Sequence, residues 1–360
     1  MRYAVNTPDN IRGLSIVELM IALTIGLVIL VAVTTLLVNS KRTYTTQDRL
    51  ARVQENGRFA MQFLIKDLRL AGYYGCSNDI TSINNTLDTS DPSKFYPFNA
   101  AYPLEGLEAA GGAWYPSNST TMPSKPVKAG TDAVAIRKLD PSSSFSLVKE
   151  MPNESAVLFL DSASGLKDGD VVMVSDCSSG DLFQITNIQD GSGVNSGKKG
   201  VVHNPGGGDP GNATQELSKS YSPPGASIMK FTSSKYFIST GAGGGPALFR
   251  EDETVTPPVA EELVEGIESL QILYGKDTDG DKMPNIYLKA GASGLETESD
   301  WNSVVSVRVG VLAVTTNQED AETDSASYDV DKDGTDDLIA PGDRNKRRVF
   351  LSTVVMRNMQ

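Results

Sequence analysis

The sequence is poor in the residues that most often carry enzyme chemistry. Its 360 residues include a single histidine, His203, and neither a G-x-S-x-G nor an H-E-x-x-H motif. Residues 191–199 fail as a phosphate-binding loop, because Ser192 stands where the first glycine belongs and Lys199 where Ser or Thr is needed. His203 lies in a Gly/Pro-rich stretch with no carboxylate or thiol next to it in sequence. We therefore predict that the chain is not an enzyme and that His203 lies at the surface.

Positive charge is also scarce. Lys and Arg number 32 against 45 Asp and Glu, which gives a formal net charge of −13. Nucleic acids attract basic surfaces, so this balance predicts no nucleic-acid partner. The 33 glycines and 18 prolines, together with many Ser, Thr and Asn, predict a loop-rich β structure rather than a helical bundle.

One long hydrophobic run stands out from this polar background. Residues 14–38 contain Glu18 as their one charged side chain. As a helix they would span about 37 Å, enough to cross a bilayer. A secretory signal peptide fits poorly, because the run is long and no small-x-small cleavage site follows it. A carboxylate in the apolar end of a membrane helix costs about 2–3 kcal/mol, so Glu18 indicates a function or a partner.

Gly13, then Leu14, then Glu18 and an unbroken apolar helix resemble the class III signal of type IV prepilins and type II secretion pseudopilins. The resemblance implies that a prepilin peptidase cuts between Gly13 and Leu14 and methylates the new Leu14 amine. It also implies that Glu18 pairs with the N-terminal amine of a neighbouring subunit. Such pairing makes physical sense, because each charge alone is costly in hydrocarbon. Many members carry Phe or Met where this chain has Leu14, and a plain signal anchor is the alternative interpretation.

The helix is predicted to continue through residues 39–72, to Gly72. Apolar residues recur there at spacings of three and four. They are Leu50, Val53, Gly57, Ala60, Met61, Leu64, Leu68 and Ala71. A second apolar line is formed by Phe59, Phe63 and Leu70. The first stripe is expected to pack on the protein's own head, and the second line either joins that core or contacts neighbouring subunits.

Strand patterns recur through the remaining residues, 73–360. The predicted strands are 133–139, 156–160, 171–175, 182–188, 227–231, 235–238, 247–250, 267–274, 304–314 and 347–358. Residues 260–266 are predicted to form a short helix or turn. The last three strands suit a central antiparallel sheet that packs on the helix. The predicted fold class is therefore α+β, a pilin fold in which one long helix packs on an antiparallel β head with long loops.

Three parts of the chain also resemble the PilW-like subfamily of minor pilins. They are the turn at residues 72–76, the predicted hairpin at 168–186 and the C-terminal strands. Cys76 and Cys177 fall inside these segments, so the resemblance implies that they form a disulfide in an oxidising periplasm. Two buried free thiols are the alternative. The predicted division is a leader (1–13), a transmembrane half-helix (14–38), an amphipathic half-helix (39–72) and a periplasmic head (73–360).

Two acidic clusters predict metal sites. The first has the D-x-D-x-D-G spacing of a calcium loop, with Asp329, Asp331, Asp333 and Asp337 as ligands. It lacks the glutamate of an EF-hand, since Ala340 occupies position twelve. The second and weaker cluster is Asp277, Asp279 and Asp281. Solvated acidic turns are the alternative for both, because Asp-Gly pairs favour turns. Ca²⁺ is the one cofactor predicted.

The resemblance implies a minor pilin that joins a tip or priming complex, starts assembly of a type IV pilus, and so supports twitching motility and adhesion. Expected partners are other minor pilins, the major pilin, the prepilin peptidase and a tip adhesin. The expected location is the inner membrane, with one span and a periplasmic head, and then the pilus tip. The alternatives are a J-like minor pseudopilin of type II secretion and a membrane-anchored calcium-dependent adhesin.

Overall fold

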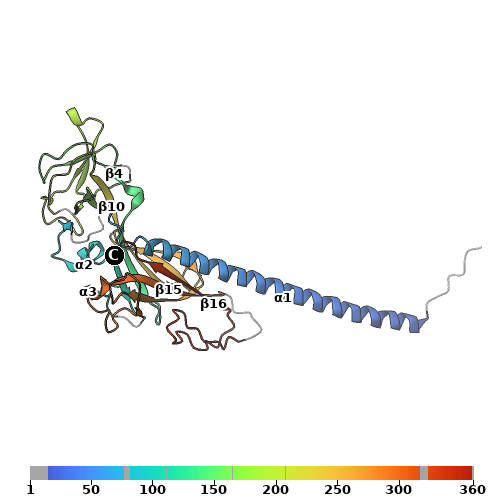
Figure 1. Cartoon of the computed structure of the whole chain (residues 1–360). Helices are drawn as coiled ribbons and strands as arrows, with labels where there is room; N and C mark the ends of the chain where they lie inside the picture. Colours follow the sequence, from blue (N-terminus) through green and yellow to red (C-terminus); the bar gives the residue numbers. More distant parts are fainter. Residues whose placement is uncertain are drawn as a thin grey trace, which may run out of the picture. The chain divides into compact units, whose positions relative to one another are not determined.

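A computed structural model describes residues 15–76, 82–109, 112–163, 165–206, 208–316 and 323–358 of the chain (Figure 1). The chain divides into two compact units, residues 1–52 and 53–360. The first unit is the helix α1 as far as Arg52, and the second holds the end of α1 together with every described strand.

The helix α1 runs without interruption from Ile16 to Leu68. It contains no proline, and the chain leaves it through a turn at Gly72, whose φ of 70° suits glycine. The Gly72 N–H donates to the Arg137 carbonyl at 3.0 Å, which fixes the exit to the head. The long helix predicted from the sequence is confirmed, although its last regular residue comes four positions before Gly72.

Four strands form the antiparallel sheet on which the end of α1 packs. Their order is β14 (Ile286–Leu288), β13 (Ile267–Lys276), β15 (Val304–Val314) and β16 (Arg347–Val355). Residues of α1 share one buried core with β13 and β15, for example Leu64 with Ile272 and Val309. The predicted central sheet is therefore confirmed, and so is the α+β fold of a long N-terminal helix packed against antiparallel strands.

A second sheet of nine strands forms the middle of the head. Its main path is β1 (Ile83–Asn85), β7 (Gly180–Gln184), β6 (Val171–Ser175), β10 (Ser227–Thr240), β11 (Pro246–Asp252) and β12 (Val259–Glu265), with β2 (Leu104–Leu107), β3 (Ala133–Leu139) and β4 (Phe145–Ser146) branching from it. The long strand β10 covers two of the predicted strands, 227–231 and 235–238. It pairs with β6 and β4 at one end and with β3 and β11 at the other. The prediction of a short helix or turn over residues 260–266 was wrong, since β12 pairs with β11 there.

A third sheet consists of β5 (Leu158–Leu160), β9 (Lys199–Val202) and β8 (Asn187–Asp190). Its Leu158 and Val201 share a buried core with Phe183 of β7, in the nine-stranded sheet. Short helices complete the described chain, namely α2 (Pro92–Phe95), α3 (Glu298–Trp301) and the 3-10 turns at Tyr96–Phe98, Pro141–Ser143 and Gly193–Asn195. The head is therefore built around separate buried clusters joined by β10.

Candidate functional site

The N-terminal end of α1 is capped by two of its own side chains. The Ser15 N–H donates to Glu18 Oε2 at 3.0 Å, and the Glu18 N–H donates to Ser15 Oγ at 3.1 Å. This reciprocal pair is a capping box, which satisfies N–H groups that a helix leaves unpaired at its start. The carboxylate of Glu18 is thereby held at the first turn and exposed. Gly13 and Leu14, the predicted processing residues, lie outside the described residues.

The part of α1 that follows Glu18 is apolar on all sides. Within the described residues, α1 is the one helix long and apolar enough to cross a membrane, and none of its most apolar window is buried. Leu27, Val28 and Leu30 are each more than 60% exposed. An all-round apolar surface of this kind needs lipid or other subunits to cover it. It is consistent with a single membrane anchor.

The C-terminal part of α1 has one buried face and one exposed apolar line. Val53, Gly57, Ala60, Met61, Leu64 and Leu68 are buried, as the predicted stripe required. Leu50, which belongs to the same stripe, is 41% exposed. Gly57 allows a close approach, because a Cβ there would lie 2.1 Å from the Phe350 ring of β16. Phe59 and Phe63 remain 47% and 38% exposed, so they do not join the core.

A polar contact ties this end of α1 to the nine-stranded sheet. Asp67 is buried, and its carboxylate pairs with the Lys138 ammonium and accepts a hydrogen bond from the Tyr236 hydroxyl at 2.7 Å. Burial, followed by the charge of Asp67, raises the pKa of Tyr236 far above its ordinary value. Asp67 is not part of the apolar stripe, so the sequence pattern does not predict its burial. The three groups fix the register of α1 on β3 and β10.

A disulfide joins Cys76 to Cys177, with the two Cα atoms 4.8 Å apart. It links the segment that leaves α1 to the turn between β6 and β7. The predicted pairing is therefore observed.

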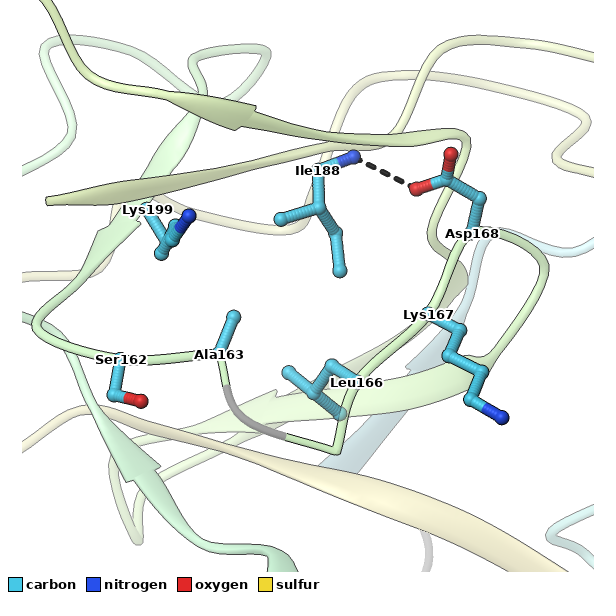
Figure 2. Close-up of a pocket in the computed structure, with 7 residues that line it drawn as sticks. All are labelled: Ser162, Ala163, Leu166, Lys167, Asp168, Ile188 and Lys199. Atoms are coloured by element: carbon cyan, nitrogen blue, oxygen red, sulfur yellow. Dashed lines mark hydrogen bonds between the residues drawn. The ribbon is translucent and has the colours of Figure 1, made fainter.

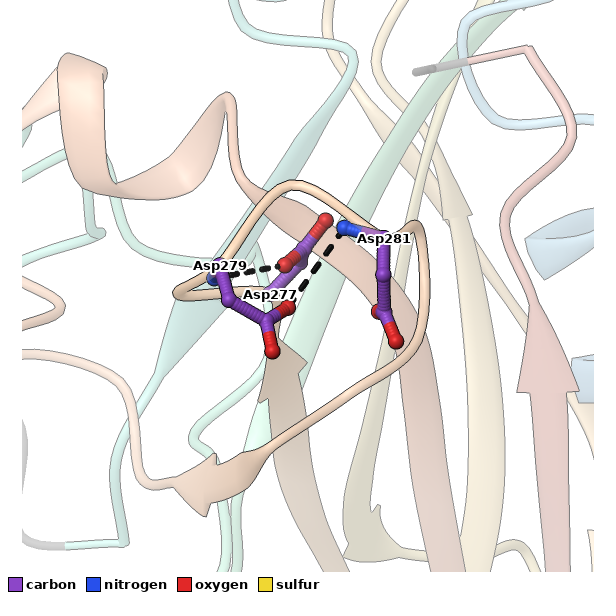
Figure 3. Close-up of side chains that lie close together, drawn as sticks. All are labelled: Asp277, Asp279 and Asp281. Atoms are coloured by element: carbon purple, nitrogen blue, oxygen red, sulfur yellow. Dashed lines mark hydrogen bonds between the residues drawn. The ribbon is translucent and has the colours of Figure 1, made fainter.

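The acidic turn of Asp277, Asp279 and Asp281 is held by hydrogen bonds within the turn. Asp277 accepts hydrogen bonds from the N–H groups of Asp279, Gly280 and Lys282, at 2.7–3.0 Å. Figure 3 shows the three carboxylates along the loop, where Asp279 and Asp281 are exposed. These backbone N–H groups account for a lowered pKa of Asp277. The arrangement is that of a solvated turn.

The other acidic loop differs because it is partly buried. One carboxylate oxygen each from Asp329, Asp331 and Asp333 lies within 4.8 Å of the others. Burial and the neighbouring Asp337 raise the pKa of Asp331 to about 6. Burial also raises the pKa of Asp337. Three of the four predicted ligands are therefore brought together, and Asp337 lies near enough to act on Asp331 electrostatically.

The predicted surface position of His203 was wrong. His203 is 1% exposed and packs against the Phe183 ring, with ring centroids 5.0 Å apart. Burial lowers the pKa of its imidazole. A surface hollow lies elsewhere on the head, lined by Ser162, Ala163, Leu166, Lys167, Asp168, Ile188 and Lys199 (Figure 2). Asp168 in that hollow accepts a hydrogen bond from the Ile188 N–H at 2.8 Å, so its carboxylate has a structural role.

Comparison with known proteins now bears on this arrangement. Residues 235–358 match the family model PilW, described as Type IV Pilus-assembly protein W. This region, about a third of the chain, is therefore similar to the PilW family. The chain is also similar in structure to a type IV-like pilin from Thermus thermophilus, at 12% identity and a TM-score of 0.33, over 86% of this chain and 99% of that one. None of the curated proteins matches the chain.

The PilW match covers the strands that pack on α1, from the second half of β10 to β16. It confirms the predicted resemblance: this part of the chain is similar to a pilin-like pilus-assembly protein with a structural, non-enzymatic role. A protein with that role associates with other pilins. Both acidic loops lie inside the PilW region, whereas the third sheet lies outside it.

The sequence analysis did not identify the buried ion pairs of the head. Arg137 and Glu105 pair with no exposed side-chain surface on either. In the PilW region, the side chain of Arg347 is 1% exposed and pairs with Glu268, Asp324 and Asp343. These contacts join residues as far as 79 positions apart, and the sequence carried no signal that would pair them.

Proposed function

We propose that this chain is a minor pilin that joins a tip or priming complex and starts assembly of a type IV pilus. In that role it would support twitching motility and adhesion. It would wait in the inner membrane with its head in the periplasm, and move to the pilus tip on assembly. Its partners would be other minor pilins, the major pilin, the prepilin peptidase and a tip adhesin.

The observation that carries this proposal is the first turn of α1. Glu18 is the one charge in residues 14–38, and Ser15 holds its carboxylate exposed beside the helix start. Cleavage between Gly13 and Leu14 would create an ammonium group next to this carboxylate in each subunit. In hydrocarbon, an amine of one subunit and Glu18 of the next would then stabilise each other.

The exposed apolar line on α1 supports packing between subunits. Phe59 and Phe63 lie one turn apart and stay exposed while the opposite face of the helix is buried. A neighbouring pilin helix would cover both rings. Burying an aromatic side chain contributes about 1.5–3 kcal/mol, so the two rings would add materially to assembly.

The size of the head supports a position at the filament end. Outside the PilW region the head carries the third sheet, whose Leu158 and Val201 share a buried core with strands β6 and β7. A filament stacks its heads closely along its length, and this additional mass is accommodated most easily where no subunit follows.

The test is a set of helix-start variants expressed in a strain that lacks the chromosomal copy. Glu18→Gln keeps an oxygen that can cap the helix but removes the charge, whereas Ser15→Ala removes half of the cap and keeps the charge. We expect Glu18→Gln and Glu18→Ala to lose surface pili and copurification with other pilins. Ser15→Ala should retain both. Glu55→Ala, which removes an exposed carboxylate farther along α1, is the matched control and should behave as wild type.

Equal membrane levels of all variants, checked by immunoblot, separate assembly from expression. Normal pili with Glu18→Gln would contradict the proposal and favour an independent anchored adhesin. Copurification of wild type with secretion pseudopilins in place of pilins would favour the type II secretion alternative.

A further inference from the structure

Residues 328–338, which lie between β15 and β16 in sequence, are docked onto the central sheet. Val330 and Asp331 of this segment are fully buried. Gly310 of β15 makes room for it, because a Cβ at that position would lie 2.1 Å from the Val330 carbonyl oxygen. At the two ends of the loop, Tyr328 and Leu338 form a β-bridge. The acidic loop 329–337 is thus held in one conformation by the sheet beneath it.

Inside the loop, backbone N–H groups hold one oxygen of each carboxylate. Asp331 Oδ1 accepts from the Asp333 N–H at 3.0 Å, and Asp333 Oδ1 from the Thr335 N–H at 2.7 Å. Asp329 Oδ2 accepts from the Gly334 N–H at 3.2 Å. These contacts orient the side chains and leave the second oxygen of each for another partner.

Those second oxygens are short of partners. Asp331 Oδ2 and Asp329 Oδ1 are both buried and accept no hydrogen bond from any described residue. Asp331 as a whole has no exposed surface. Leaving a buried polar atom without a hydrogen-bond partner destabilises the fold, and more strongly when the group is charged. The structure therefore has a place for a cation that these oxygens would bind.

The ammonium group of Lys289 pairs with only some of these carboxylate oxygens. Lys289 Nζ lies 3.3 Å from Asp333 Oδ2 but 4.0 Å from Asp331 Oδ2, beyond hydrogen-bonding distance. It is also 3.9 Å from Glu108 Oε1, which belongs to the segment after β2. Both Asp333 Oδ2 and Asp331 Oδ2 thus face the same small region.

The charges of this region do not balance. The carboxylates of Glu108, Asp331, Asp333 and Asp337 interact with the ammonium of Lys289, and Asp329 lies beside Asp331 and Asp333. Fully ionised, they sum to −5 + 1 = −4. A third buried and unpartnered oxygen, Glu108 Oε2, adds to the deficit. A divalent cation meets this deficit better than a side chain can.

We propose that Asp329, Asp331, Asp333 and Asp337 bind one Ca²⁺, which fixes the β15–β16 loop to the sheet. All the donors are oxygens, which hard cations prefer and which argue against zinc or copper. Calcium accepts irregular sets of six to eight oxygens, whereas magnesium demands a near-octahedral site. Lys289 lies beside the ion and competes with it, and Glu108 adds charge from a third segment. The site goes beyond the role in assembly and stands independently of it.

The Asp277 turn provides a contrast within the same chain. Its acidic residues have a similar spacing, but the Asp277 carboxylate accepts hydrogen bonds from three backbone N–H groups, and Asp279 and Asp281 are exposed. None of its carboxylate oxygens is both buried and unpartnered in the described structure. We therefore propose no ion there, and the turn serves as an internal control.

The test is calcium titration of the full chain, purified in detergent and freed of metal with a chelator. Isothermal titration should give one bound Ca²⁺ per chain, and saturation should raise the melting temperature. Asp331→Asn should weaken binding at least tenfold and remove the calcium-dependent rise. Asp277→Asn should bind as wild type does. Lys289→Met, which removes the competing ammonium, should bind calcium more tightly than wild type.

Circular dichroism in the absence of calcium establishes that each variant is folded before titration. The proposal is overturned if wild type gives neither heat nor a melting shift, or if folded Asp331→Asn binds as well as wild type. It is also overturned if binding is lost in Asp277→Asn and kept in Asp331→Asn. If Asp331→Asn does not fold, Lys289→Met alone decides, since unchanged or weaker binding would contradict the site.

Discussion

The buried pair of Arg137 and Glu105 predicts a large and specific loss of stability on substitution. Both side chains are fully buried, and Arg137 also donates to the carbonyl oxygens of Tyr102 at 2.7 Å and Pro97 at 3.2 Å. Its guanidinium lies 4.6 Å from the centroid of the Tyr96 ring. Arg137→Met would leave the Glu105 carboxylate buried without its counter-charge. Breaking a buried pair in this way costs about 3–5 kcal/mol.

In a head of this size, such a loss corresponds to a fall in melting temperature of about 5–10 °C. Urea unfolding of the detergent-purified chain measures it directly, with fluorescence from the buried Trp114 and Trp301 as the signal. The double variant Arg137→Met with Glu105→Gln removes both charges together. It should regain at least about half of the loss, because replacing a whole buried pair is often nearly neutral.

Two results would refute this reasoning. One is a loss of less than about 1 kcal/mol for Arg137→Met alone. The other is a double variant whose loss equals the sum of the two single losses, since independent sites add and coupled sites do not.

Three further predictions concern the rest of the head. Burial lowers the pKa of His203 below its ordinary 6.5, so below that pH the unfolded chain binds a proton that the folded chain does not, and the stability of the fold decreases as the pH drops. Urea titrations at about pH 7 and about pH 5 should show a smaller loss of stability for His203→Gln than for wild type. Equal losses would contradict this. Gly310→Ala should displace Val330 and destabilise the head by about 1–3 kcal/mol in thermal melts, and an unchanged melting temperature would show that the loop is not docked there. Replacing Cys76 and Cys177 together by serine opens a loop closed across 101 positions and should cost about 2–5 kcal/mol in chemical unfolding, whereas no loss would mean that the bridge contributes nothing to the fold.

Much of the fold could be predicted because its strands carry strong local patterns. The apolar run from Val304 to Val314 and the hairpin of β6 and β7 are buried on both faces, so their sequences look like strands without further context. The strand β12 could not be predicted in the same way. Its Glu261 and Glu262 suggest a helix, and it becomes a strand because β11 supplies the partner for its backbone.

Buried polar side chains account for most of what the sequence did not predict. Asp67 contacts Lys138 and Tyr236, which lie 71 and 169 positions away in sequence. No residue near Asp67 in sequence indicates either contact. His203 lies in a stretch whose composition predicts exposure, yet the chain folds it against Phe183. Such contacts depend on the tertiary fold and leave no periodic trace in the sequence.

The acidic loops illustrate the same limit at the candidate ion site. The spacing of Asp329, Asp331 and Asp333 predicts a calcium loop, but a similar spacing at Asp277 does so too. What separates them is burial and the presence of unpartnered oxygens, which come from docking on β15. The neighbouring Lys289 could be found only in the folded chain.

The central proposal is that this protein lies at the tip of a type IV pilus. An epitope inserted in the exposed turn at residues 279–281 can be located on sheared filaments by immunogold electron microscopy. The account predicts labels at one end of each filament, and loss of label and filaments together with Glu18→Gln. Labels spread along the filaments, or intact filaments that carry none while the protein stays in the membrane, would contradict it.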